Sequence, residues 1–127
     1  MAHLQPILTD KAPVPAGHYS QAIVHQGVVY VAGQLPITPG QKEHTLGTIE
    51  EQTRQTLNNL DAILIASSSS RDQVIRVTIY VSDVSHWPKV NAIYAEFFGN
   101  HRPARTVVPV GKLHYGYEIE LDAIAAV

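Results

Sequence analysis

Five consecutive apolar residues, Val28 to Ala32, constrain the fold of this chain more than any other segment. Together with Gly33 they are typical of a β-strand, and a strand that is apolar on both faces needs cover on both faces. The preceding segment, Ser20 to His25, predicts another strand, joined to this one by a short turn at Gly27. We therefore expect a sheet that leaves neither side of this strand to water.

A first helix is predicted after the loop that contains Pro39 and Gly40. Thr48 and Glu51 form the pattern of a capping box, in which each side chain pairs with the backbone of the other residue. Residues at three- and four-residue steps predict one buried face; they are Ile49, Thr53, Leu57, Leu60 and Leu64. The serine run that begins at Ser67 ends this helix.

A second helix is predicted between Ser85, a suitable N-cap, and Gly99, a suitable C-terminal stop. Pro88 is compatible with its first turn, where a backbone N–H is not required. Its predicted buried face consists of Trp87, Val90, Tyr94, Phe97 and Phe98.

Three further strands complete the pattern. The segment from Val74 to Val81 alternates, and the residues predicted on one face are Ile75, Val77, Ile79 and Val81. Strands are also expected at Thr106 to Val110 and at Tyr117 to Ala125. The order β-β-α-β-α-β-β predicts a single α+β domain over residues 1–127, a two-layer sandwich with both helices on one face of a mixed sheet.

Two helices on one face leave the other face of the sheet uncovered. The simplest cover is a second copy of the chain, so we expect a symmetric oligomer. The alternative is a monomer whose proline-rich N-terminal segment folds over the sheet.

The composition excludes several classes of function. The chain has no cysteine, which excludes disulfides, thiol nucleophiles and cysteine-based metal sites, and its seven histidines have no metal-binding spacing. A formal net charge of −2 without clustered Lys and Arg argues against nucleic-acid and membrane partners. Because no bilayer-spanning segment or secretory signal is found, we expect a cytoplasmic protein.

Three carboxylates, Glu118, Glu120 and Asp122, are predicted on one face of the last strand. Their mutual repulsion requires either water or cations beside them, and Arg76 and Arg105 are the candidate cations. The alternative is a solvated edge with scattered ion pairs, each contributing about 0–1 kcal/mol.

Arg105 directly precedes an apolar strand. A guanidinium at the start of such a strand offers a planar pair of donors that suits the carboxylate of a ligand. An internal ion pair with Glu120 is the alternative.

Six segments follow one another in order along nearly the whole chain: Gly17 to Ala22 (GHYSQA), Ala32 to Pro36 (AGQLP), Glu51 to Gln55 (EQTRQ), Val90 to Phe98 (VNAIYAEFF), Arg102 to Thr106 (RPART) and Glu118 to Glu120 (EIE). Together they resemble the RidA/YjgF family of reactive-intermediate deaminases. The RPART segment, followed by the paired glutamates, is the most specific part of the resemblance.

The resemblance implies a chorismate-mutase-like fold and a homotrimer with clefts between subunits. It also implies hydrolysis of 2-enamine and 2-imino acids, such as 2-aminoacrylate, to 2-keto acids and ammonia without a cofactor. By position, Arg105 matches the family's anchor for the substrate carboxylate, and Glu120 the residue that orients or activates water. Tyr19 and Asn91 match cleft residues, and Gly33 matches a backbone position that lines the pocket.

Three departures from the family pattern fall near this cleft. Val107 replaces a common cysteine, but its backbone N–H remains available to a ligand, and Ala32 replaces a frequent serine. Leu113 to Gly116 reads LHYG where LPKG is more usual, so His114 and Tyr115 are expected at the rim of the cleft.

Two alternatives to this hydrolase activity are considered. A more apolar pocket favours a non-catalytic trimer that binds small carboxylates as a sensor or regulatory partner. An RNA-directed activity is disfavoured, because the chain lacks a stripe of alternating basic and aromatic residues that could hold a strand.

Overall fold

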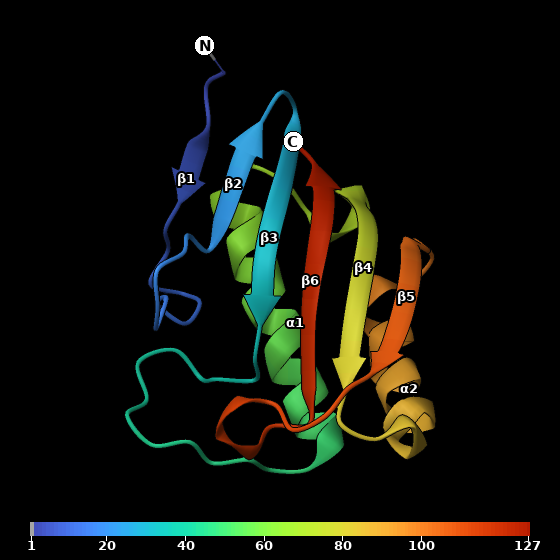
Figure 1. Cartoon of the computed structure of the whole chain (residues 1–127). Helices are drawn as coiled ribbons and strands as arrows, with labels where there is room; N and C mark the ends of the chain where they lie inside the picture. The colour runs from blue at the N-terminus through green and yellow to red at the C-terminus, as the bar shows by residue number, and fades with distance from the viewer. Residues whose placement is uncertain (1) are drawn as a thin grey trace.

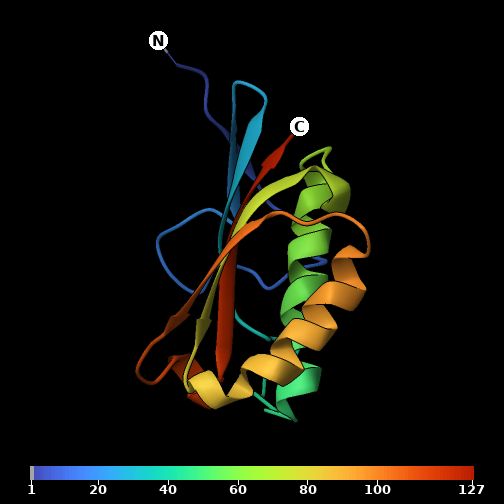
Figure 2. The ribbon, with the colours of Figure 1, turned by 90° about the vertical axis from the view of Figure 1, so that its right-hand side faces the viewer.

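The computed structural model describes residues 2–127, and within them one six-stranded sheet carries two helices on one face (Figures 1 and 2). The elements are β1 Gln5–Ile7, β2 Ala22–His25, β3 Val28–Gln34, α1 Ile49–Ala66, β4 Val74–Val81, α2 Trp87–Phe98, β5 Ala104–Pro109 and β6 Ile119–Ala126. The predicted α+β class and element order are confirmed, with the short strand β1 added at the N-terminus.

The sheet has the strand order β1-β2-β3-β6-β4-β5, so the last strand of the chain lies in its interior (Figure 1). β6 pairs antiparallel with both β3 and β4, whereas β4 and β5 are parallel and are connected through α2. Both crossover helices therefore pack on the same face, and the opposite face of the sheet, the open face, carries no helix (Figure 2).

Helix α1 begins where the sequence predicts. Thr48 and Glu51 form the predicted capping box, and all five residues of the predicted buried face are buried. Buried polar residues of the same helix hold the loop that follows β3: Thr56 donates to the Gln34 carbonyl, and Asn59 donates to the carbonyls of Leu35 and Ile37 at 3.0 and 2.9 Å. This loop consequently has a defined position beside the sheet.

Helix α2 starts differently from the prediction. Ser85 is not its N-cap: α2 begins after His86, which makes no capping hydrogen bond through its side chain, and the 3₁₀ turn Val84–His86 before it is capped by Asp83, which accepts a hydrogen bond from the Ser85 N–H. The helix ends at Gly99 as predicted, in a positive-φ conformation that suits glycine. Among the described helices, none is long and apolar enough to cross a membrane.

One further expectation is wrong. Ile75 is half exposed instead of buried, because a bulge between Val74 and Arg76 removes it from the alternation. Of the N-terminal segment, Gln5–Ile7 pairs with the edge strand β2 and extends the sheet, whereas residues 13–19 lie near Gly33 and Glu120 at one end of the open face. No α-helix of residues 2–127 covers this face (Figure 2).

Candidate active site

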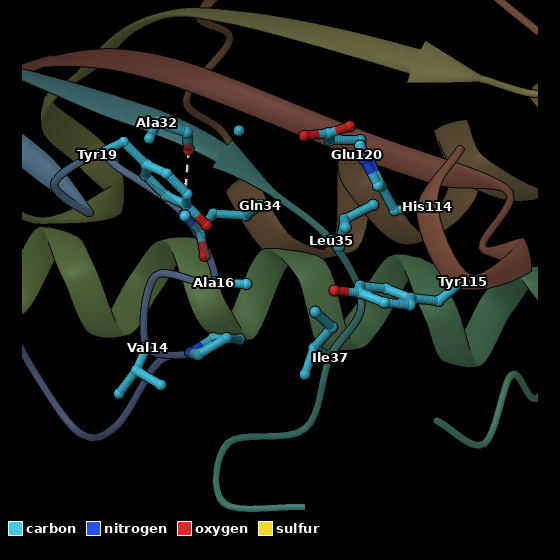
Figure 3. A pocket seen from close by; sticks show the side chains of 13 residues that line it. Val14, Ala16, Tyr19, Ala32, Gln34, Leu35, Ile37, His114, Tyr115 and Glu120 are labelled. Atoms are coloured by element: carbon cyan, nitrogen blue, oxygen red, sulfur yellow. Dashed lines mark hydrogen bonds between the residues drawn. The ribbon is translucent and has the colours of Figure 1, made fainter. Parts of the chain in front are cut away.

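A cavity of about 460 Å³ lies at the end of β3, between the N-terminal segment and the turn before β6 (Figure 3). We call it the Glu120 cavity. It is lined by Pro13, Val14, Ala16, Gly17, Tyr19, Ala32, Gly33, Gln34, Leu35, Ile37, His114, Tyr115 and Glu120. Most of these side chains are apolar or aromatic, and Glu120 is the only carboxylate among them, a composition typical of small-molecule sites.

Gly33 and Glu120 meet because of an irregularity in the sheet. The register between β3 and β6 shifts between Val31 and Gln34, which brings the Gly33 backbone against the Glu120 side chain. A Cβ atom at position 33 would overlap Glu120 Oε2 and lie 3.2 Å from its Cδ. Glycine is therefore required for the carboxylate to lie in this position.

The environment of Glu120 favours its protonated form. Burial is the largest effect and raises the pKa of the carboxyl above its ordinary value; His114 lowers it, and the negative charge of Asp122 raises it again. Asp122 itself accepts a hydrogen bond of 2.8 Å from the Tyr80 hydroxyl. A carboxylate with a raised pKa is a stronger proton acceptor than a fully hydrated one.

Arg105 belongs to a second group of side chains, on the edge strand β5. Its guanidinium lies 4.4 Å from the ring centroid of Trp87 and 4.8 Å from that of Tyr94, and it donates a hydrogen bond of 3.0 Å to Asn91 Oδ1. These three partners lie on α2. We call the four residues the Arg105 cluster; it holds an exposed guanidinium in one orientation.

Glu120 and Arg105 lie on opposite faces of the sheet. Arg105 is paired with Val77, whose side chain is in the helix-covered core, whereas Glu120 is paired with Tyr80. Val77 and Tyr80 are three residues apart on β4, so their side chains point to opposite faces. The two charged groups cannot form one site within a single chain.

The expected ion pairs of the carboxylates are also wrong for the described residues. Glu118 lies just before β6 and is 3.1 Å from His86 Nε2. Arg76 donates instead to Thr106 Oγ1 at 3.0 Å. The suggested internal pair between Arg105 and Glu120 is excluded by their positions on opposite faces.

The predicted site residues divide between the two regions. Tyr19, Ala32, Gly33 and Tyr115 line the Glu120 cavity, whereas Asn91 belongs to the Arg105 cluster. Val107 lies two residues beyond Arg105 on β5, paired with Ile79, so its side chain is on the same side as that of Arg105.

Sequence reasoning missed the apolar part of the cavity wall. Val14 and Ala16 come from the N-terminal segment, and Leu35 and Ile37 come from the loop after β3. The available signal was the presence of apolar residues in two segments that no predicted helix or strand accounted for.

Known proteins resemble this chain over almost its full length. The family model described as Endoribonuclease L-PSP matches residues 9–127. A RutC family protein of Pyrococcus horikoshii is 46% identical over 119 residues, which cover 94% of each chain. The structure of RidA from an Antarctic Psychrobacter bacterium is similar with a TM-score of 0.92 and 32% identity, covering 97% of this chain and 99% of that one.

A further solved structure, that of Escherichia coli TdcF with bound serine, has a TM-score of 0.92 and 30% identity, and covers 97% of this chain and 98% of that one. The fold and the two charged regions define a class of two-layer α+β domains with a small cavity at the open face of the sheet. The chain belongs to the RidA/YjgF family, as its sequence motifs predict.

Proposed function

We propose that this protein hydrolyses 2-imino acids and their enamine tautomers, such as 2-aminoacrylate, to 2-keto acids and ammonia. The observation that carries the proposal is Glu120, a partly desolvated carboxyl held against Gly33 in the wall of a small-molecule cavity. Its raised pKa suits it to accept a proton from an attacking water molecule. Membership in the RidA/YjgF family supports the same activity.

The proposed site is completed by a second copy of the chain. Arg105 is exposed on the edge strand and held by stacking, so it is available to a neighbouring molecule. In a homotrimer, the Arg105 of one subunit would bind the substrate carboxylate while the Glu120 of the next subunit faces the C=N carbon. The uncovered open face supports such an assembly.

The chemistry then requires few groups. Glu120 accepts a proton from water as the water oxygen bonds to the imine carbon, and returns this proton to the imine nitrogen. In the resulting 2-amino-2-hydroxy acid, the hydroxyl proton passes through Glu120 to the amino group as the C–N bond breaks, so that ammonia leaves and the hydroxyl oxygen becomes the keto oxygen. Tyr19, Asn91 and the backbone N–H groups of Gly33 and Val107 would position the substrate, with no cofactor.

Complementation between two inactive variants tests this arrangement. Arg105→Ala and Glu120→Gln chains, carrying different affinity tags, are co-expressed, and mixed oligomers are purified through both tags. Each variant alone should be inactive, whereas every mixed cyclic trimer should contain one intact site, so that about a third of the sites in the purified oligomers are restored. Mixed oligomers as inactive as the parents would contradict a site shared between chains.

A non-catalytic carboxylate-binding protein of the same fold is the second candidate. It is favoured by the apolar Val107 and Ala32 and by the TdcF structure, which contains bound serine. It predicts saturable binding of 2-keto acids by calorimetry and no acceleration of imine decay. Turnover well above the spontaneous rate would exclude it.

A further inference from the structure

Tyr115 adopts an unusual backbone conformation at the edge of the Glu120 cavity. Its φ and ψ are 61° and 14°, in the left-handed region that is unfavourable for a residue with a Cβ atom. Such a conformation persists only where the surrounding structure holds it, and it is concentrated at ligand sites.

His44, from the loop between β3 and α1, holds the ring of Tyr115. The two rings are stacked, with centroids 4.0 Å apart and planes 12° from parallel. His44 Nδ1 is in turn hydrogen-bonded to the hydroxyl of the buried Tyr117 at 3.1 Å. His44 is thus fixed on one side by Tyr117 and supports Tyr115 on the other.

Helix α1 fixes both segments that carry these rings. The buried Gln52 donates from Nε2 to the Gly47 carbonyl at 3.3 Å, and its Oε1 accepts from the Glu118 N–H at 2.9 Å. In the sequence, Gly47 follows His44 by three residues in the loop before α1, and Glu118 follows Tyr115 by three residues before β6. One buried side chain consequently sets the distance between the two segments.

The ring of Tyr115 forms one wall of the apolar part of the cavity. Figure 3 shows its hydroxyl directed inward, toward Ile37, with Leu35 close by and with Tyr19 and Val14 at the far end. A three-carbon imino acid of roughly six heavy atoms occupies on the order of 180 Å³ at about 30 Å³ per water-sized group. The cavity, at about 460 Å³, has room for a considerably larger side chain.

We propose that Tyr115, positioned by His44, is a specificity-determining wall that adapts this site to 2-imino acids with large apolar side chains. The inference rests on the proposed hydrolase function and extends it to a substrate class. The side chain of the substrate would lie among Val14, Leu35 and Ile37 and against the free side of the Tyr115 ring. His44 acts through Tyr115 and is a positioning residue.

The test compares kcat/KM for imino acids generated in place by an amino-acid oxidase from leucine and from alanine. The wild-type protein should prefer the leucine product, and Tyr115→Ala should reduce this preference about tenfold or more, mainly through KM for the larger substrate. His44→Ala should reduce it in the same direction, and His44→Phe, which keeps a flat ring for stacking, should restore it. Lys42→Ala, on the same exposed loop, should leave it unchanged.

A preference that Tyr115→Ala leaves intact, with hydrolysis retained, would overturn this inference but not the proposed function. If no variant and no wild-type protein hydrolyses imines, calorimetry with 4-methyl-2-oxopentanoate and pyruvate provides the second measurement. If the wild type binds the larger keto acid selectively and Tyr115→Ala loses this selectivity, the specificity role of Tyr115 is supported although the hydrolase function fails. Equal binding of both acids by the wild type would overturn the specificity role of Tyr115.

Discussion

Glu120 and Arg105 carry the two charges of the candidate site, and the protein surrounds them in different ways. Glu120 lies on the interior strand β6, partly desolvated, against a glycine backbone and beside a second carboxylate. Arg105 lies on the edge strand β5, exposed to water, with its guanidinium over two aromatic rings and bonded to an amide oxygen.

The different environments of Glu120 and Arg105 suit the different roles proposed for them, proton acceptor and carboxylate anchor. Removing water from a carboxylate raises its pKa and makes it a better base. A guanidinium stays charged in any environment, so partial burial would not activate it; what it needs is a fixed orientation and free donors for a ligand. Stacking on Trp87 and Tyr94 and the hydrogen bond to Asn91 provide that orientation while the Arg105 side chain stays exposed. One region is therefore built for reactivity and the other for recognition.

Arg105→Ala should produce the largest loss of activity, because the Arg105 cluster then has no cation to bind the substrate carboxylate. We expect kcat/KM for a 2-imino acid to fall up to about 1000-fold. Arg105→Lys keeps the charge but loses the planar pair of donors, so it should recover only part of the loss. Steady-state kinetics on both variants check this, and full activity in Arg105→Lys would show that charge alone is sufficient.

Gly33→Ala should lower activity by disturbing the Glu120 cavity, with little effect on folding. The added methyl group would displace the Glu120 carboxylate, the flexible end of a side chain, and a shift of about 1 Å at a reacting group reduces rates on the order of 100-fold. Gly111→Ala is the matched control, since no heavy atom lies within 4 Å of its added carbon. Kinetics and thermal melting are measured together; a large loss of stability with unchanged kcat would refute this assignment.

Trp87→Leu should weaken recognition moderately by removing one of the two rings beneath Arg105. We expect KM to rise about two- to fivefold, which corresponds to about 0.5–1 kcal/mol for an exposed cation–π pair, with kcat nearly unchanged. Phe97→Leu removes the similar ring beneath Arg71, 4.0 Å from its guanidinium and outside the site. The two variants should differ in KM, and equal values would mean that stacking does not position Arg105.

The smallest expected effect is on stability: besides losing activity, Glu120→Gln should change the stability of the fold in a pH-dependent way. Because burial raises the pKa of Glu120 in the folded chain, its ionised form destabilises the fold above the ordinary pKa, and this penalty disappears below it. The variant should therefore melt above the wild type at pH 7 and together with it in acid. Glu43→Gln, on an exposed loop, controls for the loss of one negative charge. A difference that grows as the pH falls would contradict the raised pKa.

Local patterns explain most of the correct predictions. The capping box of Thr48 and Glu51 and the stripe of α1 depend only on residues within a few turns of one another, and both are confirmed. Strand β1 was missed because three residues that include Pro6 carry no alternation that could be recognised, and their pairing with β2 stabilises them. Ile75 was misplaced because a bulge depends on the partner strand and not on the residue itself.

The sequence alone determined the α+β class, the two amphipathic helices, the family and the identity of the charged residues, because periodicity and motifs are local properties of a chain. Only the tertiary structure decided that β6 lies between β3 and β4, that Gly33 meets Glu120 and that His44 meets Tyr115. It also decided that Arg105 and Glu120 lie on opposite faces of the sheet. These relations arise from long-range pairing and packing, whose free energy is shared among residues far apart in the chain and leaves no pattern in any one segment.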